Sequence, residues 1–504
     1  MHSFTSKSFL LTALSCLAAC GGGSDSSSVA STSDAFGAAL KTRTSSTATT
    51  QAATAQKDPL LATIEAAVAV PGSQIVVVGG SVGTAIKGAR RYAELTDVPW
   101  SGLAAGTRVM VLPGSFAGPI AMTANGSAAA PIRVEPVDPA QVPVVRNSID
   151  IRGASYLTVT GLQVQSPVWG GFVIRQGSRQ ITLDRNVVRN APIGIDITEG
   201  AGLGLVISQN VIEDSTTHAI NVATNATSAQ RNAITGNTLR RSGHHGIELR
   251  GSFWRVERND VSGSGRSIPG TSGIHVYSPG PDDNSGDDNI VRYNTSHANA
   301  DTAASDGNGI QIDHWCDRNT VAFNLVWGND GSGINIYEAT DNLVYANTSL
   351  INNLDPNKTH GALGEIVIGA SPSNNRTTRN RVFDNIAVST RANVPAIYVD
   401  GRAYLNANQV GPNLPYNAAG GTVVRWSDST FLKDVASIDA ITGIRGNVVE
   451  LPAFVDYTNP LQGGLRLTRA PGGRGTALSN EIDFGNASSQ SGQVNFGAYF
   501  FAGQ

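Results

Sequence analysis

Short runs of alternating apolar and polar residues recur along the middle of the chain. In the run 272–277 (Ser-Gly-Ile-His-Val-Tyr), Ile274 and Val276 would point to one face of a strand and His275 and Tyr277 to the other. The same order of small, apolar, polar and apolar residues appears at 193–197, 218–222, 245–249, 308–312 and 332–336. A pattern that returns at this spacing is typical of stacked repeats, so we expect a solenoid of short strands.

Asparagine forms a second pattern in the same phase. Eight asparagines each follow a short apolar run, at roughly 20- to 40-residue spacing: Asn186, Asn210, Asn237, Asn259, Asn294, Asn324, Asn347 and Asn385. Stacked asparagines can hydrogen bond to one another, and this residue type tolerates left-handed turns. Together the two patterns predict an all-β fold, a right-handed parallel β-helix. The absence of a hexapeptide repeat disfavours a left-handed one.

The segment 85–95 (AIKGARRYAEL) before Val98-Pro99 has the composition of a short helix. We expect this helix to cap the N-terminal end of the solenoid, where an open strand edge would otherwise pair with other chains. Glycine is frequent (56 residues) and charged residues are few (15%), which suits strands joined by tight turns. The net charge of −3 and the lack of a basic tract give no reason to expect nucleic acid as a partner, and we expect a monomer.

The first twenty residues carry a targeting pattern. Lys7 precedes an apolar run that ends in Leu17-Ala18-Ala19-Cys20, which resembles the lipobox of bacterial lipoproteins. The resemblance implies removal of residues 1–19 and lipidation of Cys20. Because Gly21 follows rather than Asp, it also implies export to the outer membrane of a Gram-negative bacterium, with the lipid as the only membrane contact. An ordinary secretion signal with a chance cysteine is the alternative. Residues 20–57, rich in Ser, Thr and Ala, would be a flexible tether.

Both ends of the remaining chain resemble a known architecture. The stretches "GTRVMVLPGSFAGPI", "APIRVEP" and "SYLTVTGLQV", and later "LPAFVDYTNPLQGGLRLTRAPGGRGTA" and "VNFGAYFF", resemble the opening and closing segments of secreted right-handed parallel β-helix proteins. We therefore expect an N-terminal cap and first rungs at 58–150, the β-helix core with its functional loops at 151–450, and a closing segment at 451–504. With Cys20 lipidated, Cys316 has no partner for a disulfide and should pack in the core.

Long insertions surround the strand at 274–277. The segments 262–271, 297–306 and 353–363 extend the turns on one edge of the predicted sheet, and 278–288 extends the other edge. Loops on both flanks of one strand predict a cleft, and long loops on a rigid scaffold commonly carry function.

If neighbouring rungs stack in register, the outward residues form two columns with about 4.8 Å between rungs. The first column contains Asp196, Asn221, Glu248, His275, Gln311 and Asn335; the second contains Thr198, Ala223, Arg250, Tyr277, Asp313 and Tyr337. A register slip of one residue would turn His275 inward and remove the site.

The middle of these columns suits removal of a proton next to a carboxylate. Arg250 would neutralise the substrate carboxylate, and His275, which ordinarily titrates near neutral pH, would be the base. Tyr277 would donate a proton to the leaving oxygen, or act as the base if Arg250 lowers its pKa. Glu248 and Asp313 would orient the histidine and arginine. The residues expected to contact sugars are Gln311, Asn335, Tyr337, His314 and Trp315.

The predicted fold is similar to that of pectate, alginate and chondroitin lyases and of mannuronan C5-epimerases. This resemblance implies an acidic, uronic-acid-containing polysaccharide as substrate and cleavage by β-elimination. No complete family motif is present, and Lys358 is the only lysine between Asn186 and Asn385. The alternatives are a C5-epimerase, a glycoside hydrolase that uses Glu248 and Asp313, and a polysaccharide-binding lipoprotein without catalysis.

Two further groups of residues have open interpretations. Asp282, Asp283, Asp287 and Asp288 form either a Ca²⁺ site or a solvated acidic loop. Ca²⁺ is the only cofactor that we expect. The tryptophans are either sugar platforms or buried core residues: Trp169, Trp254, Trp315 and Trp327.

Overall fold

The computed structural model describes residues 58–80, 86–358, 363–405, 407–472, 481–487 and 496–501. Residues 1–57 lie outside the described part, so the signal peptide, the tether and lipidation at Cys20 stay predictions. None of the helices in the described ranges is long and apolar enough to span a membrane.

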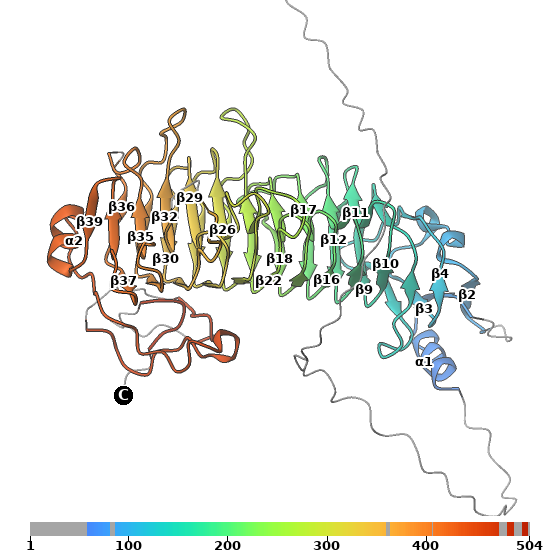
Figure 1. Ribbon diagram of the computed structural model, residues 1–504. Helices are drawn as coiled ribbons and strands as arrows, with labels where there is room; N and C mark the ends of the chain where they lie inside the picture. Colours follow the sequence, from blue (N-terminus) through green and yellow to red (C-terminus); the bar gives the residue numbers. More distant parts are fainter. Residues whose placement is uncertain are drawn as a thin grey trace, which may run out of the picture. The chain divides into compact units, whose positions relative to one another are not determined.

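The chain coils through three parallel β-sheets, which we call sheets A, B and C (Figure 1). Sheet A consists of β1 (Gln74–Val78), β2 (Ala89–Tyr92), β3 (Thr107–Val111), β6 (Ile132–Pro136), β9 (Ser155–Thr160), β12 (Arg179–Asp184), β15 (Val206–Ser208), β18 (Asn232–Thr235), β21 (Trp254–Glu257), β24 (Ile290–Arg292), β27 (Thr320–Ala322), β30 (Leu343–Tyr345), β33 (Arg381–Phe383) and β36 (Gln409–Val410).

Sheet B consists of β4 (Ser115–Phe116), β7 (Val144–Val145), β10 (Gln163–Gln165), β13 (Val187–Arg189), β16 (Val211–Glu213), β19 (Thr238–Arg240), β22 (Asp260–Ser262), β25 (Thr295–His297), β28 (Leu325–Trp327), β31 (Thr348–Leu350), β34 (Ile386–Ser389) and β37 (Leu414–Asn417).

Sheet C carries the strands of the predicted site. It consists of β5 (Ile120–Met122), β8 (Ile149–Arg152), β11 (Gly170–Arg175), β14 (Ile193–Ile197), β17 (Ile220–Val222), β20 (Ile247–Leu249), β23 (Ser272–Val276), β26 (Asn308–Asp313), β29 (Ile334–Tyr337), β32 (Ile366–Gly369), β35 (Ile397–Val399), β38 (Val424–Trp426) and β39 (Thr430–Leu432). Successive turns pair in parallel, and β38 with β39 is the antiparallel exception. The predicted parallel β-helix is confirmed.

Alternation along each strand separates the interior from the outer faces. In β23 and β26 the inward residues Ile274, Val276, Ile310 and Ile312 are completely buried in one continuous aliphatic core. Removal of this apolar surface from water is the main stabilising contribution to the fold, about 25 cal/mol per Å². Cys316 is buried in the same core with a free thiol, as predicted.

The predicted asparagine ladder is confirmed at one corner of the helix. Each ladder Oδ1 accepts hydrogen bonds from the backbone N–H and the Nδ2 of the preceding ladder residue, as between Asn186 and Asn210 at 3.0 and 3.1 Å. The left-handed conformation lies one residue earlier than expected, for example at Arg185 (φ 51°) and Gln209 (φ 52°). The asparagine side chain therefore bonds between rungs, and its predecessor makes the turn.

Two further asparagine ladders, which the sequence patterns did not reveal, stabilise the other corners. One runs through Asn289, Asn319, Asn342, Asn380 and Asn408. The other runs through Asn299, Asn329 and Asn352 and ends on the buried carboxylate of Glu365. These ladders hold the turns next to sheet C at a fixed spacing.

The N-terminal helix is shorter and earlier than predicted. Helix α1 spans Pro59–Val68, begins with Asp58 as N-cap, and packs on outward residues of β1 and β3. The segment predicted as helical instead contains the edge strand β2, because Gly88 adopts φ 93°, which a helix does not allow. The short 3₁₀ helices η1 (Leu95–Asp97) and η2 (Trp100–Gly102) then insert Leu95 and Trp100 into the core.

The C-terminal residues close the other end of the fold. Helix α2 (Val435–Thr442) follows β39 and ends at the left-handed Gly443 (Figure 1). After η3 (Pro460–Gln462), the closing segment packs along outward aromatic side chains of sheet A: the ring of Phe500 meets that of Phe323 edge to face at 5.7 Å, and Tyr293 donates to the carbonyl of Ile482.

Candidate functional site

The strands of sheet C pair in the register that the predicted site requires. One outward column runs without a slip along sheet C: Asp150, Val173, Asp196, Asn221, Glu248, His275, Gln311, Asn335, Val367, Tyr398 and Arg425. In the second column, Asp313 pairs with Tyr337, and the backbone N–H of Tyr277 bonds to the carbonyl of Leu249 as the same register requires.

His275 is held between two carboxylates. Its Nδ1 lies 2.6 Å from Glu248 Oε2 and its Nε2 lies 3.2 Å from Asp313 Oδ2, and all three side chains are buried. Burial disfavours the charged imidazole, yet the two carboxylates outweigh it and raise the pKa of His275 to about 10. The ring is therefore a cation at neutral pH, and the predicted role of His275 as the base does not fit this environment.

The same contacts bear on the hydrolase alternative. Burial acts to raise the pKa of Glu248, but the charge of His275 and its hydrogen bond lower it below the ordinary value. Glu248 therefore stays ionised and cannot donate a proton to a leaving oxygen near neutral pH. Glu248 and Asp313 lie on the two sides of one imidazolium, so both orient His275, and neither forms an ion pair with Arg250 within the described residues.

Three further histidines lie on the N-terminal side of His275 and Glu248. The rings of His245 and His275 stack with their centroids 4.3 Å apart. The ring centroid of His245 also lies 3.9 Å from that of His244 and 5.5 Å from that of His218. Burial, the first cause in each case, lowers the pKa of His218 to about 4 and that of His245 well below its ordinary value. The lowered pKa values keep these rings neutral at neutral pH, and they lie in a row on one side of the charged His275.

His245, Glu248 and His275 offer ligand atoms within 4.8 Å of one another, which is close enough for a metal ion. However, His245 Nδ1 accepts a hydrogen bond of 2.9 Å from the backbone N–H of Ser272, which leaves the proton on Nε2, 3.5 Å from Glu248. A metal-binding histidine instead coordinates the ion through one ring nitrogen and donates the N–H of the other to a hydrogen-bond acceptor. The donors therefore fit a hydrogen-bonded network better than a metal centre.

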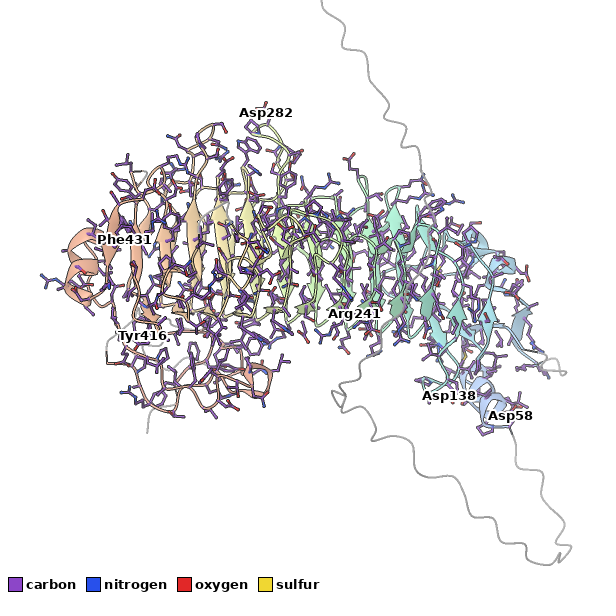
Figure 2. The ribbon with its side chains drawn as sticks, viewed as in Figure 1. Asp58, Asp138, Arg241, Asp282, Tyr416 and Phe431 are labelled. Atoms are coloured by element: carbon purple, nitrogen blue, oxygen red, sulfur yellow. The ribbon has the colours of Figure 1, made fainter. Side chains whose placement is uncertain are left out.

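The four aspartates of the loop 278–288 do not converge on one point. Asp282 is exposed at the loop tip (Figure 2), and Asp283 accepts a hydrogen bond from the backbone of Ser285. Asp287 and Asp288 both pair with Arg318, at 2.8 and 2.9 Å. Because one guanidinium already neutralises two of the four predicted Ca²⁺ ligands, this geometry does not favour the Ca²⁺ interpretation.

Tyr277 and Arg250 remain available for a ligand. Burial first, and then the charges of Asp313 and Glu248, raise the pKa of Tyr277, although Arg250 acts to lower it. The phenol is therefore suited to donate a proton, and the alternative in which Arg250 turns it into a base does not hold. No hydrogen bond from the Tyr277 hydroxyl and no ion pair of Arg250 occur within the described residues.

A cavity of about 550 Å³ opens on the outer face of sheet C, on the C-terminal side of His275. Five predicted residues line it: Gln311, Asp313, His314, Asn335 and Tyr337. Trp315, Glu248, His275, Tyr277 and Arg250 lie outside its lining. A second set of lining residues was not predicted from the sequence, and it includes Asp306, Lys358, Tyr398, Asp400, Arg402, Arg425 and Asp428.

Apart from Asp306, which ends the insertion 297–306, the missed residues come from the part of the chain after residue 337. In β32 and β35 the side chains still alternate between the inner and outer faces, but these strands lack the glycine and polar residue of the earlier pattern. Continued alternation was the signal that could have found Tyr398. Lys358 belongs to the long insertion after β31, and its Nζ donates to the carbonyl of Asp306 at 3.2 Å. Burial lowers the pKa of Lys358, and nearby aspartates oppose the shift.

His314 is the cavity residue whose environment best fits a base. Its Nδ1 lies 2.8 Å from Oε2 of Glu338, a buried carboxylate that also accepts a hydrogen bond from Asn374. A proton on Nδ1 leaves Nε2 as an acceptor, and Nε2 is 3.5 Å from Asp313 Oδ1, beyond a strong hydrogen bond. The backbone of His314 has φ 28°, which ends β26.

Two tyrosines flank His314. The ring of Tyr277 meets the imidazole edge to face at 5.9 Å, and the ring of Tyr337 does so at 5.7 Å. Burial raises the pKa of Tyr337, as it does that of Tyr277, so both phenols keep their protons at neutral pH. An acceptor nitrogen between two proton donors is an arrangement suited to acid–base chemistry.

Comparisons with known proteins agree with this architecture. A family model described as "Right handed beta helix region" matches residues 147–349. The fold is a right-handed parallel β-helix. No curated protein sequence matches the chain.

Several solved structures resemble the chain at low identity. Pectate lyase Pel9A is 14% identical, with 85% of this chain and 96% of that chain covered and a TM-score of 0.44. The A-module of the Azotobacter vinelandii mannuronan C-5 epimerase AlgE6 is 15% identical, with 65% and 88% covered and a TM-score of 0.43. An alginate lyase from Paenibacillus sp. str. FPU-7 is 15% identical, with 48% and 90% covered and a TM-score of 0.36.

Proposed function

We propose that this protein is a polysaccharide lyase that cleaves a uronic-acid-containing polysaccharide by β-elimination on the outer face of sheet C. The observation that carries this proposal is the position of His314, which lines the cavity, is oriented by the buried Glu338, and lies between Tyr277 and Tyr337. This assignment moves the base from His275 to His314 and keeps the predicted substrate class.

In the proposed reaction, Nε2 of His314 takes the C5 proton of the uronate. The electron pair released from the C5–H bond forms the C4–C5 double bond while the bond from C4 to the glycosidic oxygen breaks. The phenol of Tyr277 gives its proton to the leaving oxygen. The raised pKa of Tyr277 supports this donor role, because the phenol is protonated at neutral pH.

The substrate carboxylate needs a positive charge so that negative charge can develop at C5. Arg250 and Lys358 form no ion pair with any residue in the described ranges, whereas Arg402 is held by Asp400 through two bonds of 2.8 Å. Arg250, one rung from Tyr277, is the proposed partner of the carboxylate at the cleavage point. Lys358 would contact a carboxylate of a neighbouring sugar in the cavity.

The test is ultraviolet absorbance of the conjugated double bond that elimination creates. Purified protein is incubated with alginate, polygalacturonate, glucuronan and glycosaminoglycans, beside a His314→Gln variant. An absorbance rise that the variant abolishes supports the proposal. New reducing ends without absorbance would instead indicate hydrolysis, and binding without either product would indicate a non-catalytic protein.

C5-epimerisation is a second candidate that one observation favours. Tyr277 and Tyr337 lie at similar distances on two sides of His314, so a proton could return to the opposite face of C5 after His314 removes it. Epimerisation would incorporate deuterium from heavy water at C5 without breaking the chain. Nuclear magnetic resonance of the recovered polymer distinguishes this outcome from elimination.

A further inference from the structure

A second, smaller hollow lies on the same outer face, nearer the N-terminus. It has a volume of about 260 Å³ and is lined by residues of β11, β14 and the turns beside them, among them Trp169, Val173, Arg175 and Asp196. Trp169 is 57% exposed, whereas Trp254 is completely buried. An exposed indole that forms one wall of a hollow is a common feature of ligand sites, because it offers a large flat apolar surface.

The ring of Trp169 is presented on a fixed backbone. The carbonyl of Trp169 accepts a hydrogen bond of 3.3 Å from Ile193, which joins it to the next rung. The following residue, Gly170, has no space for a side chain, since a Cβ there would lie 2.9 Å from Val173 Cγ2. Gly170 thus allows the backbone to pass close to Val173, and Trp169 and Val173 line the same hollow.

We propose that Trp169 is a remote sugar-binding platform, on which a pyranose ring of the polysaccharide stacks while the same chain extends to the cavity at His314. This inference rests on the proposed function for the identity of the ligand. Stacking of a sugar ring on an indole uses the apolar face of the pyranose, and the polar groups of Asp196 and Thr198 beside it can bond the hydroxyls.

The register connects the two hollows along a single column. Val173 in the small hollow and Gln311 in the large cavity are separated by five rungs, through Asp196, Asn221, Glu248 and His275. Five steps of about 4.8 Å give roughly 24 Å. Several linked sugars span this length and a trisaccharide does not, so Trp169 would add affinity for long chains alone.

The charges at this hollow indicate stacking rather than ion pairing. Arg175 is neutralised by Asp150 through bonds of 2.8 and 2.7 Å, and Asp196 accepts a hydrogen bond of 2.8 Å from Asn221. The Trp169 contribution should therefore be insensitive to salt, in contrast to that of Arg250, because screening weakens only interactions between charges.

Affinity electrophoresis in gels that contain alginate, polygalacturonate or hyaluronan tests this inference, with Trp169→Ala and the matched control Val168→Ala. Val168 is 71% exposed and lies next to Trp169 but does not line the hollow. We expect Trp169→Ala to weaken binding of the retarding polymer about tenfold at low and high salt. Binding of a trisaccharide from that polymer, measured by calorimetry, should stay unchanged, and Val168→Ala should behave as the wild type.

Equal affinity of the two variants for polymer would overturn the inference, as would the absence of retardation in all three gels. If elimination occurs but Trp169→Ala binds like the control, the inference fails and the proposed lyase stands. If Trp169→Ala weakens polymer binding in a protein that shows no elimination, the lyase proposal fails and the binding platform stands.

Discussion

Nδ1 of His314 lies 2.8 Å from the buried carboxylate of Glu338, while His275, on the preceding strand of sheet C, is bonded by carboxylates at both ring nitrogens. One carboxylate orients an imidazole and leaves its second nitrogen as an acceptor. Two carboxylates, one at each nitrogen, stabilise the doubly protonated ring, which raises the pKa of His275 to about 10. Neighbouring histidines are thereby given different chemical roles.

Replacement of Glu338 by Gln tests the orienting contact. Gln is similar in size but is neutral, so the charge that stabilises the protonated form of His314 during proton transfer is lost. We expect kcat to fall roughly 10-fold or more, with a smaller change in KM. Steady-state kinetics would measure both constants, and an unchanged kcat would exclude this role for Glu338.

The two tyrosines can be separated by single variants. Tyr277→Phe should reduce kcat about 100-fold or more if the phenol protonates the leaving oxygen. Tyr337→Phe retains the ring but removes the second donor, and elimination should continue at a rate within about tenfold of the wild type. The reverse order of effects in the same assay would assign the acid to Tyr337.

His275 should affect stability rather than the chemistry directly. Its folded-state pKa is raised from 6.5 to about 10, so its stabilising contribution is complete below about pH 6.5 and is lost as the pH rises through 10. His275→Gln leaves Glu248 and Asp313 facing each other without a cation, which should cost about 3 kcal/mol at pH 7. Thermal unfolding between pH 6 and 10 measures this loss. An equal pH dependence in variant and wild type would contradict it.

Arg250 should act on the substrate carboxylate. Arg250→Ala should lower kcat/KM by about 100-fold at low salt, since a charge-assisted contact in the transition state is lost. Arg379→Ala is the control, because this exposed arginine pairs with Asp341 in the turns that precede the sheet A strands β33 and β30. Equal kinetics for the two variants would remove Arg250 from the site.

The sequence predicted the fold well because its strongest signals are local and repeated. Alternation in segments such as 272–277 determines which side chains face inward, and stacked asparagines such as Asn186 and Asn210 determine the phase of the turns. The capping helix was misplaced because Gly88 breaks a segment of helical composition by its positive φ. A single glycine within a helical pattern did not reveal that conformation.

The site could be predicted only in part. Its columns followed from the register, but the protonation of His275 depends on carboxylates 27 and 38 residues away along the chain, on opposite sides of its ring. His314 follows the alternating run, and its backbone φ of 28° and its contact with Glu338 arise from the turn after β26. Neither feature has a signature in the residue pattern.

The most direct test of the account is the ultraviolet absorbance of polysaccharide digests by wild-type protein, His314→Gln and His297→Gln. His297 is a matched control, since it also contacts a carboxylate, that of Asp260, but lies on sheet B. We expect an absorbance rise for the wild type and His297→Gln, and a rate at least about 100-fold lower for His314→Gln. Undiminished elimination by His314→Gln would contradict it.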